Sequence, residues 1–146
     1  MFDHILIVCA GNICRSPFGE AVLQALLPQK KISSAGFLTE QSGLIGKPSD
    51  LLAQEVARDL GYNLKKHRAK QLSLELSQKA DLILFMEQDQ KRLLENMDSE
   101  ALKKSLLFSH WSGEGDIPDP YGKNKKAFAY SFSLILKGAE AWGQKL

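Results

Sequence analysis

The residues of greatest chemical interest lie near the N-terminus, where Cys9 precedes Arg15 by six positions and Ser16 follows directly. The residues between them are Ala10, Gly11, Asn12, Ile13 and Cys14. If this stretch joins a buried strand to a helix, its backbone N–H groups and the positive end of the helix dipole form a cradle for a dianion such as phosphate. The same field stabilises a thiolate at Cys9, and the guanidinium of Arg15 matches two phosphate oxygens. The pattern therefore predicts attack of Cys9 on phosphorus while Arg15 holds the phosphoryl oxygens.

A phosphate ester also needs a proton for its leaving oxygen, and the segment around Asp119 offers one. Prolines flank Asp119 on both sides and stiffen the backbone around its carboxyl group, and Tyr121 follows. The segment belongs to the stretch 109–124, which is long for a connection without a function. We therefore predict Asp119 as the general acid. Asp116 lacks the pair of prolines and is expected to be solvated.

The elements that must position these residues can be predicted from the apolar patterns. Strands are expected at residues 4–9, 31–35, 81–86 and 105–108. Helical patterns begin near Ser16, Ser49 and Asp89, and a final helix carries an apolar stripe that ends at Trp142. The sequence predicts an α/β fold, a single domain over residues 1–146, with a four-stranded parallel sheet and helices on both faces. Ligands in such sheets bind beyond the carboxyl ends of the strands, and Cys9 lies at such an end.

Composition limits the range of partners and cofactors. A chain of 146 residues with 44% apolar composition has the usual size of one domain. Its 19 basic and 17 acidic residues leave a net charge of +2, which argues against nucleic acid as the main ligand. We find no secretion signal and no apolar run near the ~20 residues of a membrane span, so we expect a cytoplasmic protein without membrane insertion. The two cysteines lack zinc spacing, and no metal or cofactor is predicted.

Taken together, Cys9-x5-Arg15-Ser16 and the late Asp119-Pro-Tyr121 resemble the low-molecular-weight protein tyrosine phosphatases over essentially the whole chain. Further matches are Ser34–Gly36, His67 with Lys70-Gln71, Asp81–Met86 and Phe108–Ser112. The sequence is most similar to the bacterial branch (the Wzb and AmsI type), whose members act on tyrosine autokinases of capsule and exopolysaccharide export. The resemblance implies hydrolysis of phosphotyrosine through a cysteinyl-phosphate intermediate, with the phosphorylated tail of a membrane kinase as substrate.

The resemblance also implies roles for single residues. Cys9 would attack phosphorus, Arg15 would bind the phosphoryl group and Ser16 would donate a hydrogen bond to the thiolate. Asp119 would protonate the tyrosine and later activate water. Phosphate and other oxyanions would bind in the loop between Cys9 and Ser16.

Three further roles concern the surroundings of this loop. Asn12 would fix the loop conformation, with His67 behind it. Tyr121 would form part of the wall against which the substrate ring packs. Which residue of 37–44 faces the substrate is left open, and Gly122 in place of a second tyrosine leaves the pocket more open.

The residue pattern argues against two other functions. Arsenate reduction on the same fold, as known in relatives, relays oxidation through further cysteines, and none follows Cys14. A phosphotyrosine-binding module without turnover would need no nucleophile and no acid.

Cys14 itself keeps two interpretations, since it either packs beneath the loop or forms a reversible disulfide with an oxidised Cys9. The charged stretch Glu87–Arg92 is interpreted as an exposed helix face.

Overall fold

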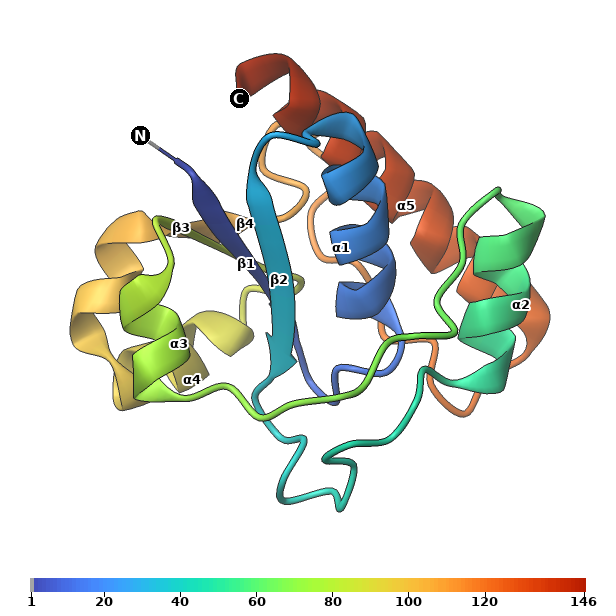
Figure 1. The fold of residues 1–146 in the computed structure, drawn as a ribbon, viewed down its shortest axis with the longest axis horizontal. Helices are drawn as coiled ribbons and strands as arrows, with labels where there is room; N and C mark the ends of the chain where they lie inside the picture. Colours follow the sequence, from blue (N-terminus) through green and yellow to red (C-terminus); the bar gives the residue numbers. More distant parts are fainter. Residues whose placement is uncertain (1) are drawn as a thin grey trace.

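A sheet of four parallel strands forms the centre of the protein (Figure 1). The computed structural model describes residues 2–146. In the order β2-β1-β3-β4, the strands are β1 (His4–Cys9), β2 (Lys31–Gly36), β3 (Leu82–Phe85) and β4 (Ser105–Leu107). Their bounds differ from the predicted ones by no more than one residue at either end. The predicted α/β class with a parallel sheet of four strands is therefore confirmed.

Helices cover both faces of the sheet, as predicted. They are α1 (Arg15–Leu26), α2 (Leu51–Asp59), α3 (Leu74–Lys79), α4 (Gln90–Met97), the 3-10 helix η1 (Ser99–Lys104) and α5 (Lys125–Lys145). Figure 1 shows α1, α2 and α5 on one side of the sheet and α3 and α4 on the other. The sequence did not predict α3 or η1, because an element of six residues is too short to display a helical period.

The central strand β1 is apolar at successive positions because each of its faces meets a different layer of helices. Ile5 and Ile7 belong to the core beneath α1 and α5, while Leu6 and Val8 belong to the core beneath α4 and η1. All four side chains are fully buried. A strand covered on both faces cannot alternate apolar with polar residues, which is the pattern that the sequence displays.

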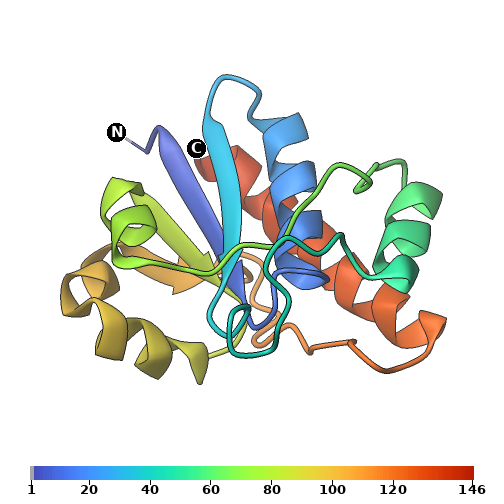
Figure 2. The same cartoon turned by 60° about the horizontal axis from the view of Figure 1, so that its bottom comes forward.

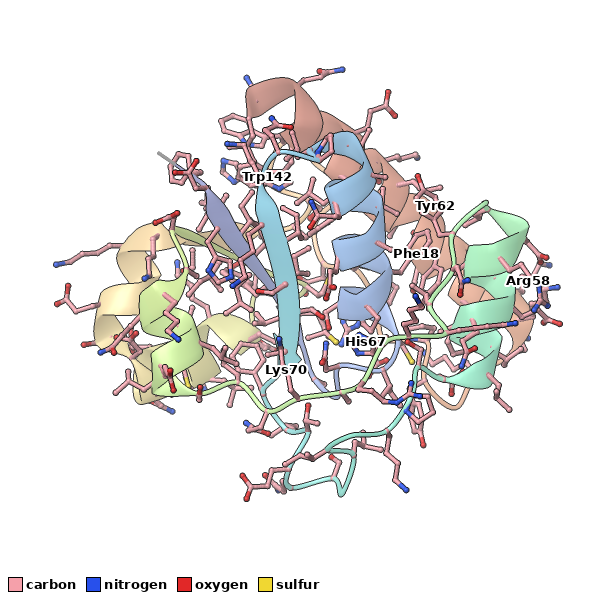
Figure 3. All side chains as sticks on the ribbon, viewed as in Figure 1. Phe18, Arg58, Tyr62, His67, Lys70 and Trp142 are labelled. Carbon is pink, nitrogen blue, oxygen red and sulfur yellow. The ribbon has the colours of Figure 1, made fainter. Side chains whose placement is uncertain are left out.

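Helix α1 begins two residues earlier than a helix capped by Ser16 would. Cys14 occupies the N-cap position and makes no capping hydrogen bond with its side chain. Ser16, a residue type that favours the N-cap position, lies inside the first turn instead. Further along, the ring of Phe18 stacks on Phe132 of α5 with centroids 4.1 Å apart and meets the edge of Tyr62 (Figure 3). This packing anchors the N-terminal part of α1 on α5.

The strand order places a topological switch point at the carboxyl end of β1. From β1 the chain passes through α1 to β2 on one side, whereas β3 pairs with the other side of β1. Connections that leave in opposite directions open a crevice at this edge, where open parallel sheets bind their ligands. Figure 2 brings this edge forward and shows the segments 37–48 and 109–124 meeting there.

Candidate active site

The loop 10–14 connects β1 to α1 and presents backbone donors toward the crevice. Asn12 has a φ of 61° and is the only residue other than glycine with a positive φ in residues 2–146. The N–H groups of residues 11–14 donate to no backbone carbonyl within this described range. Donors of this kind at a helix N-terminus form an anion-binding concavity.

The side chain of Asn12 holds the loop in this conformation. Its Nδ2 donates to Ser16 Oγ at 2.7 Å and to Ser34 Oγ at 3.0 Å, and its Oδ1 accepts from the backbone N–H of Lys70 at 3.0 Å. The backbone carbonyl of Asn12 accepts a hydrogen bond from His67 Nε2 at 2.7 Å. Asn12 is fully buried, so leaving any of these groups unpaired would cost about 1–3 kcal/mol. The loop is therefore strongly held.

The hydrogen bonds of Ser16 leave a donor for the sulfur of Cys9. Ser16 Oγ accepts from the amide of Asn12, and it lies 2.9 Å from Cys9 Sγ. Because a lone pair of the Ser16 hydroxyl faces the amide, the hydroxyl proton is free to point at the sulfur. A hydrogen bond donated to sulfur stabilises the thiolate relative to the thiol.

His67 supports the loop from behind as a neutral imidazole. Burial lowers the pKa of His67, although the hydrogen bond to Asn12 and the carboxylate of Glu20 act in the opposite direction. A carbonyl can only accept, so the proton of the neutral ring resides on Nε2. Figure 3 shows His67 and Lys70 close to the carboxyl end of the sheet, on the segment that crosses it.

The second cysteine, Cys14, is a poor candidate nucleophile. It is buried at the start of α1, and both cysteines are free thiols. Burial raises the pKa of the Cys14 thiol far above its usual range, and the negative charges of Asp50, Cys9 and Asp119 raise it further. Cys14 therefore stays protonated, which leaves Cys9 as the sulfur able to act as a nucleophile.

Arg15 is almost completely buried, with an exposed fraction of 1%. Its Nη1 donates to Glu87 Oε1 at 2.6 Å and to the carbonyl of Ile117 at 2.7 Å, and its Nη2 lies 3.7 Å from Asp119 Oδ2. Burial opposes the positive charge, but Cys9, Asp119 and Glu87 outweigh it and raise the pKa of Arg15. Its Nε is buried and has no partner among residues 2–146, which suits a donor meant for an oxyanion.

Glu87 corrects the sequence analysis. The sequence pattern predicts an exposed helix face for it and its neighbours, but it lies before α4, two residues after the end of β3, and forms an ion pair with Arg15. A carboxylate beside a buried guanidinium compensates the charge and fixes the direction of the planar group. A signal was available, because Glu87 follows a buried strand at the same edge of the sheet as Cys9.

Asp119 reaches the crevice on a loop that is tied to the sheet just upstream. The N–H of Ile117 donates to the carbonyl of Met86 at 2.9 Å, and Ser131 of α5 donates to the carbonyl of Pro118 at 2.7 Å. Asp119 Oδ1 accepts from the N–H of Tyr121 at 3.1 Å. Its side chain is 45% exposed, as suits a group that must meet both a substrate and water. Asp116 is exposed and accepts from the N–H of Gln88.

One pocket of about 190 Å³ brings most of the predicted residues together. Its lining consists of Cys9, Ala10, Gly11, Ile13, Cys14, Arg15, Leu38, Ser42, Leu44, Asp119 and Tyr121. Of the range 37–44, which the sequence left open, Leu38, Ser42 and Leu44 line the pocket, while Phe37 packs against the core under α4. Apolar side chains beside the anion-binding loop can hold an aromatic ring. Ser16, Asn12 and His67 lie outside the lining and act through the loop.

Gly36 sets how closely the loop 10–14 can approach β2. A Cβ at this position would lie 2.8 Å from the carbonyl of Ala10, 3.0 Å from the N of Asn12 and in severe contact with Thr39 Oγ1. We expect Gly36→Ala to lower the free energy of unfolding by about 1–3 kcal/mol, as overpacking does. Because displacement of the loop misaligns the reacting groups, kcat/KM should fall by about 10²-fold. Chemical unfolding and a phosphatase assay measure the two effects.

Gly143→Ala provides the matched control. A Cβ there meets Leu26 at an ordinary distance of 3.6 Å, and the position lies within α5. This change should stabilise the protein slightly, since alanine favours a helix, and leave kcat/KM unaltered. Equal effects of both substitutions would contradict the role assigned to Gly36.

Two negative findings apply to residues 2–146. This described part contains no group of three or more His, Cys, Asp or Glu side chains placed to hold a metal ion. None of its helices combines the length and the apolar character needed to cross a membrane.

Comparisons with known proteins agree with the geometry. The profile of the Low molecular weight phosphotyrosine protein phosphatase family matches residues 4–146. The chain is 42% identical over 146 residues to the low molecular weight protein-tyrosine-phosphatase Wzb of Escherichia coli K12, covering 100% of this chain and 97% of the relative. The structure of Vibrio vulnificus Wzb in complex with benzylphosphonate superimposes with a TM-score of 0.98 at 47% identity, covering 100% of both chains. That of the tyrosine phosphatase AmsI of Erwinia amylovora has a TM-score of 0.95 at 38% identity, covering 100% of this chain and 94% of the other.

The chain therefore belongs to the low molecular weight phosphotyrosine protein phosphatase family. It is a protein-tyrosine phosphatase, a hydrolase acting on phosphotyrosine. The relatives include Wzb and AmsI, the branch that the sequence analysis identified.

Proposed function

We propose that Cys9 is the nucleophile of a two-step phosphoryl transfer. In the first step, Cys9 Sγ attacks phosphorus, an S–P bond forms and the bond from phosphorus to the tyrosine oxygen breaks. Asp119 gives its proton to that oxygen, so phenol rather than phenolate leaves. Arg15 Nε and the N–H groups of the loop 11–14 bind the nonbridging oxygens while charge redistributes among them.

In the second step, water replaces the protein sulfur on phosphorus. Asp119, now a carboxylate, takes a proton from the water as its oxygen attacks. The S–P bond breaks, phosphate leaves and Cys9 returns to the thiolate, which accepts a hydrogen bond from Ser16. Every proton taken in this cycle is returned, so the same carboxyl group serves as acid and then as base.

A single juxtaposition carries this proposal. The thiol of Cys9 and the unpartnered Nε donor of Arg15 come from one loop near the N-terminus, and the carboxylate of Asp119, more than 100 positions later, meets them in one crevice. A module that only bound phosphotyrosine would need the donors but not the sulfur or the carboxylate. Arsenate reduction would need a further thiol to resolve the oxidised Cys9, and none follows Cys14 in the sequence.

Chemical quench during turnover tests the nucleophile directly. The purified protein is mixed with a phosphotyrosine peptide without added metal, stopped with acid within the first turnovers, digested and analysed by mass spectrometry with fragmentation. We expect the mass of one phosphoryl group on Cys9. Phosphate on Cys14 instead, or turnover that starts only when a divalent ion is added, would contradict the proposal. The Cys14→Ser protein serves as control and should give the same phosphorylated Cys9.

We also infer the setting of the reaction. The similarity to Wzb and AmsI supports a cytoplasmic role in exopolysaccharide or capsule regulation, with the phosphorylated tyrosine-rich tail of a membrane kinase as substrate. The benzylphosphonate bound by the Vibrio vulnificus relative joins an aromatic ring to a phosphorus oxyanion, as phosphotyrosine does. The pocket of the present chain offers the same two features, apolar walls and an anion-binding loop.

A further inference from the structure

Five exposed cations lie on two neighbouring segments that extend away from the pocket. They are Lys47, Lys65, Lys66, Arg68 and Lys70, which we call the basic band. None of the five forms an ion pair with a carboxylate in residues 2–146, so their charges are not neutralised by direct contact. The whole chain has a net charge of only +2, so the band is a local excess of positive charge.

Backbone hydrogen bonds hold the two segments of the band together and against the active site. The N–H of Ala69 donates to the carbonyl of Lys47 at 2.8 Å, and that of Gly46 donates to the carbonyl of Ala69 at 2.8 Å. The N–H of Lys47 donates to the carbonyl of Leu44, whose side chain lines the pocket. On the other segment, the N–H of Lys70 donates to Asn12 Oδ1 in the catalytic loop. The band therefore begins at the pocket wall.

On the second segment, exposed cationic side chains alternate with buried or half-buried ones. Ala69 is buried and His67 half-buried, while Lys66, Arg68 and Lys70 alternate with them and are exposed. Figure 3 shows Lys70 beside His67 near the carboxyl end of β2. The arrangement turns the apolar and hydrogen-bonding groups toward the catalytic loop and the cations toward solvent.

Nearby carboxylates offset the band only in part. Glu20 is bound through its Oε1 to the hydroxyl of Ser34, and Glu40 is exposed next to Gln71, whose Oε1 accepts from the Glu40 N–H. Neither lies within ion-pairing distance of a band cation. With Asp119 in the pocket lining and Asp50 close enough to act on Cys14, four carboxylates oppose the five cations, which leaves a small excess of positive charge on this side of the pocket.

We propose that the basic band binds anionic side chains that flank the phosphotyrosine in the substrate. This inference rests on the proposed function, because a phosphotyrosine held in the pocket places the neighbouring residues of its own chain over the surface around the pocket mouth. The anionic groups are carboxylates of Asp or Glu, or the phosphate of a further phosphotyrosine. Each exposed ion pair contributes little, but several cations acting together also steer the encounter.

The test compares a band variant with a charge-matched control on paired substrates. The variant is Lys65→Glu/Lys66→Glu, and the control is Lys31→Glu/Lys145→Glu, whose positions lie at the start of β2 and at the end of α5. The substrates are p-nitrophenyl phosphate and three phosphotyrosine peptides of equal length, flanked by Gln, by Glu or by a second phosphotyrosine. kcat/KM is measured at low and at high salt.

We expect the wild-type protein to prefer the anionic peptides over the Gln peptide by about three- to tenfold at low salt. The preference should vanish at ~1 M salt, where the Debye length is about 3 Å. The band variant should lose the preference, while its turnover of p-nitrophenyl phosphate and of the Gln peptide stays unchanged. The control should keep the preference. The larger of the two anionic preferences identifies the source of the recognised charge.

Equal kcat/KM values for all three peptides in the wild-type protein would overturn the inference. So would binding of wild-type protein, but not of the band variant, to vesicles containing anionic lipid with no peptide preference, because the band would then serve a membrane surface. Failure of the wild-type protein to hydrolyse p-nitrophenyl phosphate is a different result, which would refute the proposed function itself.

Discussion

Cys9→Ser is expected to lower kcat for an aryl phosphate by roughly 10⁴-fold or more, the scale seen when a covalent nucleophile is removed. A serine hydroxyl at this position stays protonated near neutral pH, and a neutral hydroxyl is a weak nucleophile. Sulfur is intrinsically a much better nucleophile than a hydroxyl oxygen, and the Cys9 sulfur lies 2.9 Å from the Ser16 hydroxyl, which can donate a hydrogen bond to it. A continuous assay with p-nitrophenyl phosphate measures the loss.

Binding separates a missing nucleophile from a misfolded protein. The Cys9→Ser protein keeps Arg15 and the loop donors, so added phosphate should still raise its Tm at least as much as in the wild-type protein, since the competing negative sulfur is gone. Cys14→Ser is the matched control and should keep kcat within about tenfold, because serine is a good residue at a helix N-cap. Turnover that survives in Cys9→Ser but not in Cys14→Ser would reverse the assignment of the nucleophile.

Much of the fold could be predicted because its strands carry an unambiguous signal. In β1 and β3 the apolar residues are consecutive, since both faces of the sheet are covered, and this is visible in a single sequence. The short elements α3 and η1 gave no such signal. Helix α3 contacts the central strand β1, and η1 contacts α4, β3 and β4, so their positions depend on tertiary contacts rather than on a local period.

The main site residues could be predicted because the sheet topology brings the carboxyl ends of its strands to one edge. Cys9 and Asp119 are far apart in the sequence, but Cys9 ends β1, and the loop of Asp119 is bonded at Ile117 to the end of β3. A rule about strand ends therefore places them together without any knowledge of distances. The same rule applies to Glu87, which also follows a buried strand. Its place at the site was not predicted because the charged residues after it have a helical pattern.

Other features could not be predicted, because they depend on how loops pack on one another. The choice of Leu38, Ser42 and Leu44 as lining residues is fixed by the fold of the segment 37–48 over the catalytic loop, where the Thr39 hydroxyl donates to the carbonyl of Gly11 at 3.0 Å. Ser16 illustrates the same limit. Its local preference is to cap a helix, but a tertiary hydrogen bond to Cys9 uses its hydroxyl instead.

Asp119→Asn is expected to separate substrates by the basicity of their leaving groups. An amide cannot supply the proton that the departing tyrosine oxygen needs, so kcat/KM for phosphotyrosine should fall by about 10²–10⁴-fold. A p-nitrophenolate ion is stable without protonation, and kcat/KM for p-nitrophenyl phosphate should fall much less. The quantity kcat/KM is the right measure, because it includes steps only up to release of the phenol and is insensitive to hydrolysis of the cysteinyl phosphate.

Asp116→Asn is the matched control for this prediction. Asp116 lies on the same loop, is exposed and accepts a hydrogen bond from the N–H of Gln88, a bond that the amide oxygen of asparagine can replace. It should show no dependence on the leaving group. If Asp119→Asn slowed both substrates equally, the carboxylate of Asp119 would act on Arg15, which lies 3.7 Å away, rather than on the leaving oxygen. If kcat/KM of the Asp116→Asn protein instead fell steeply with the basicity of the leaving group, Asp116 would be the general acid.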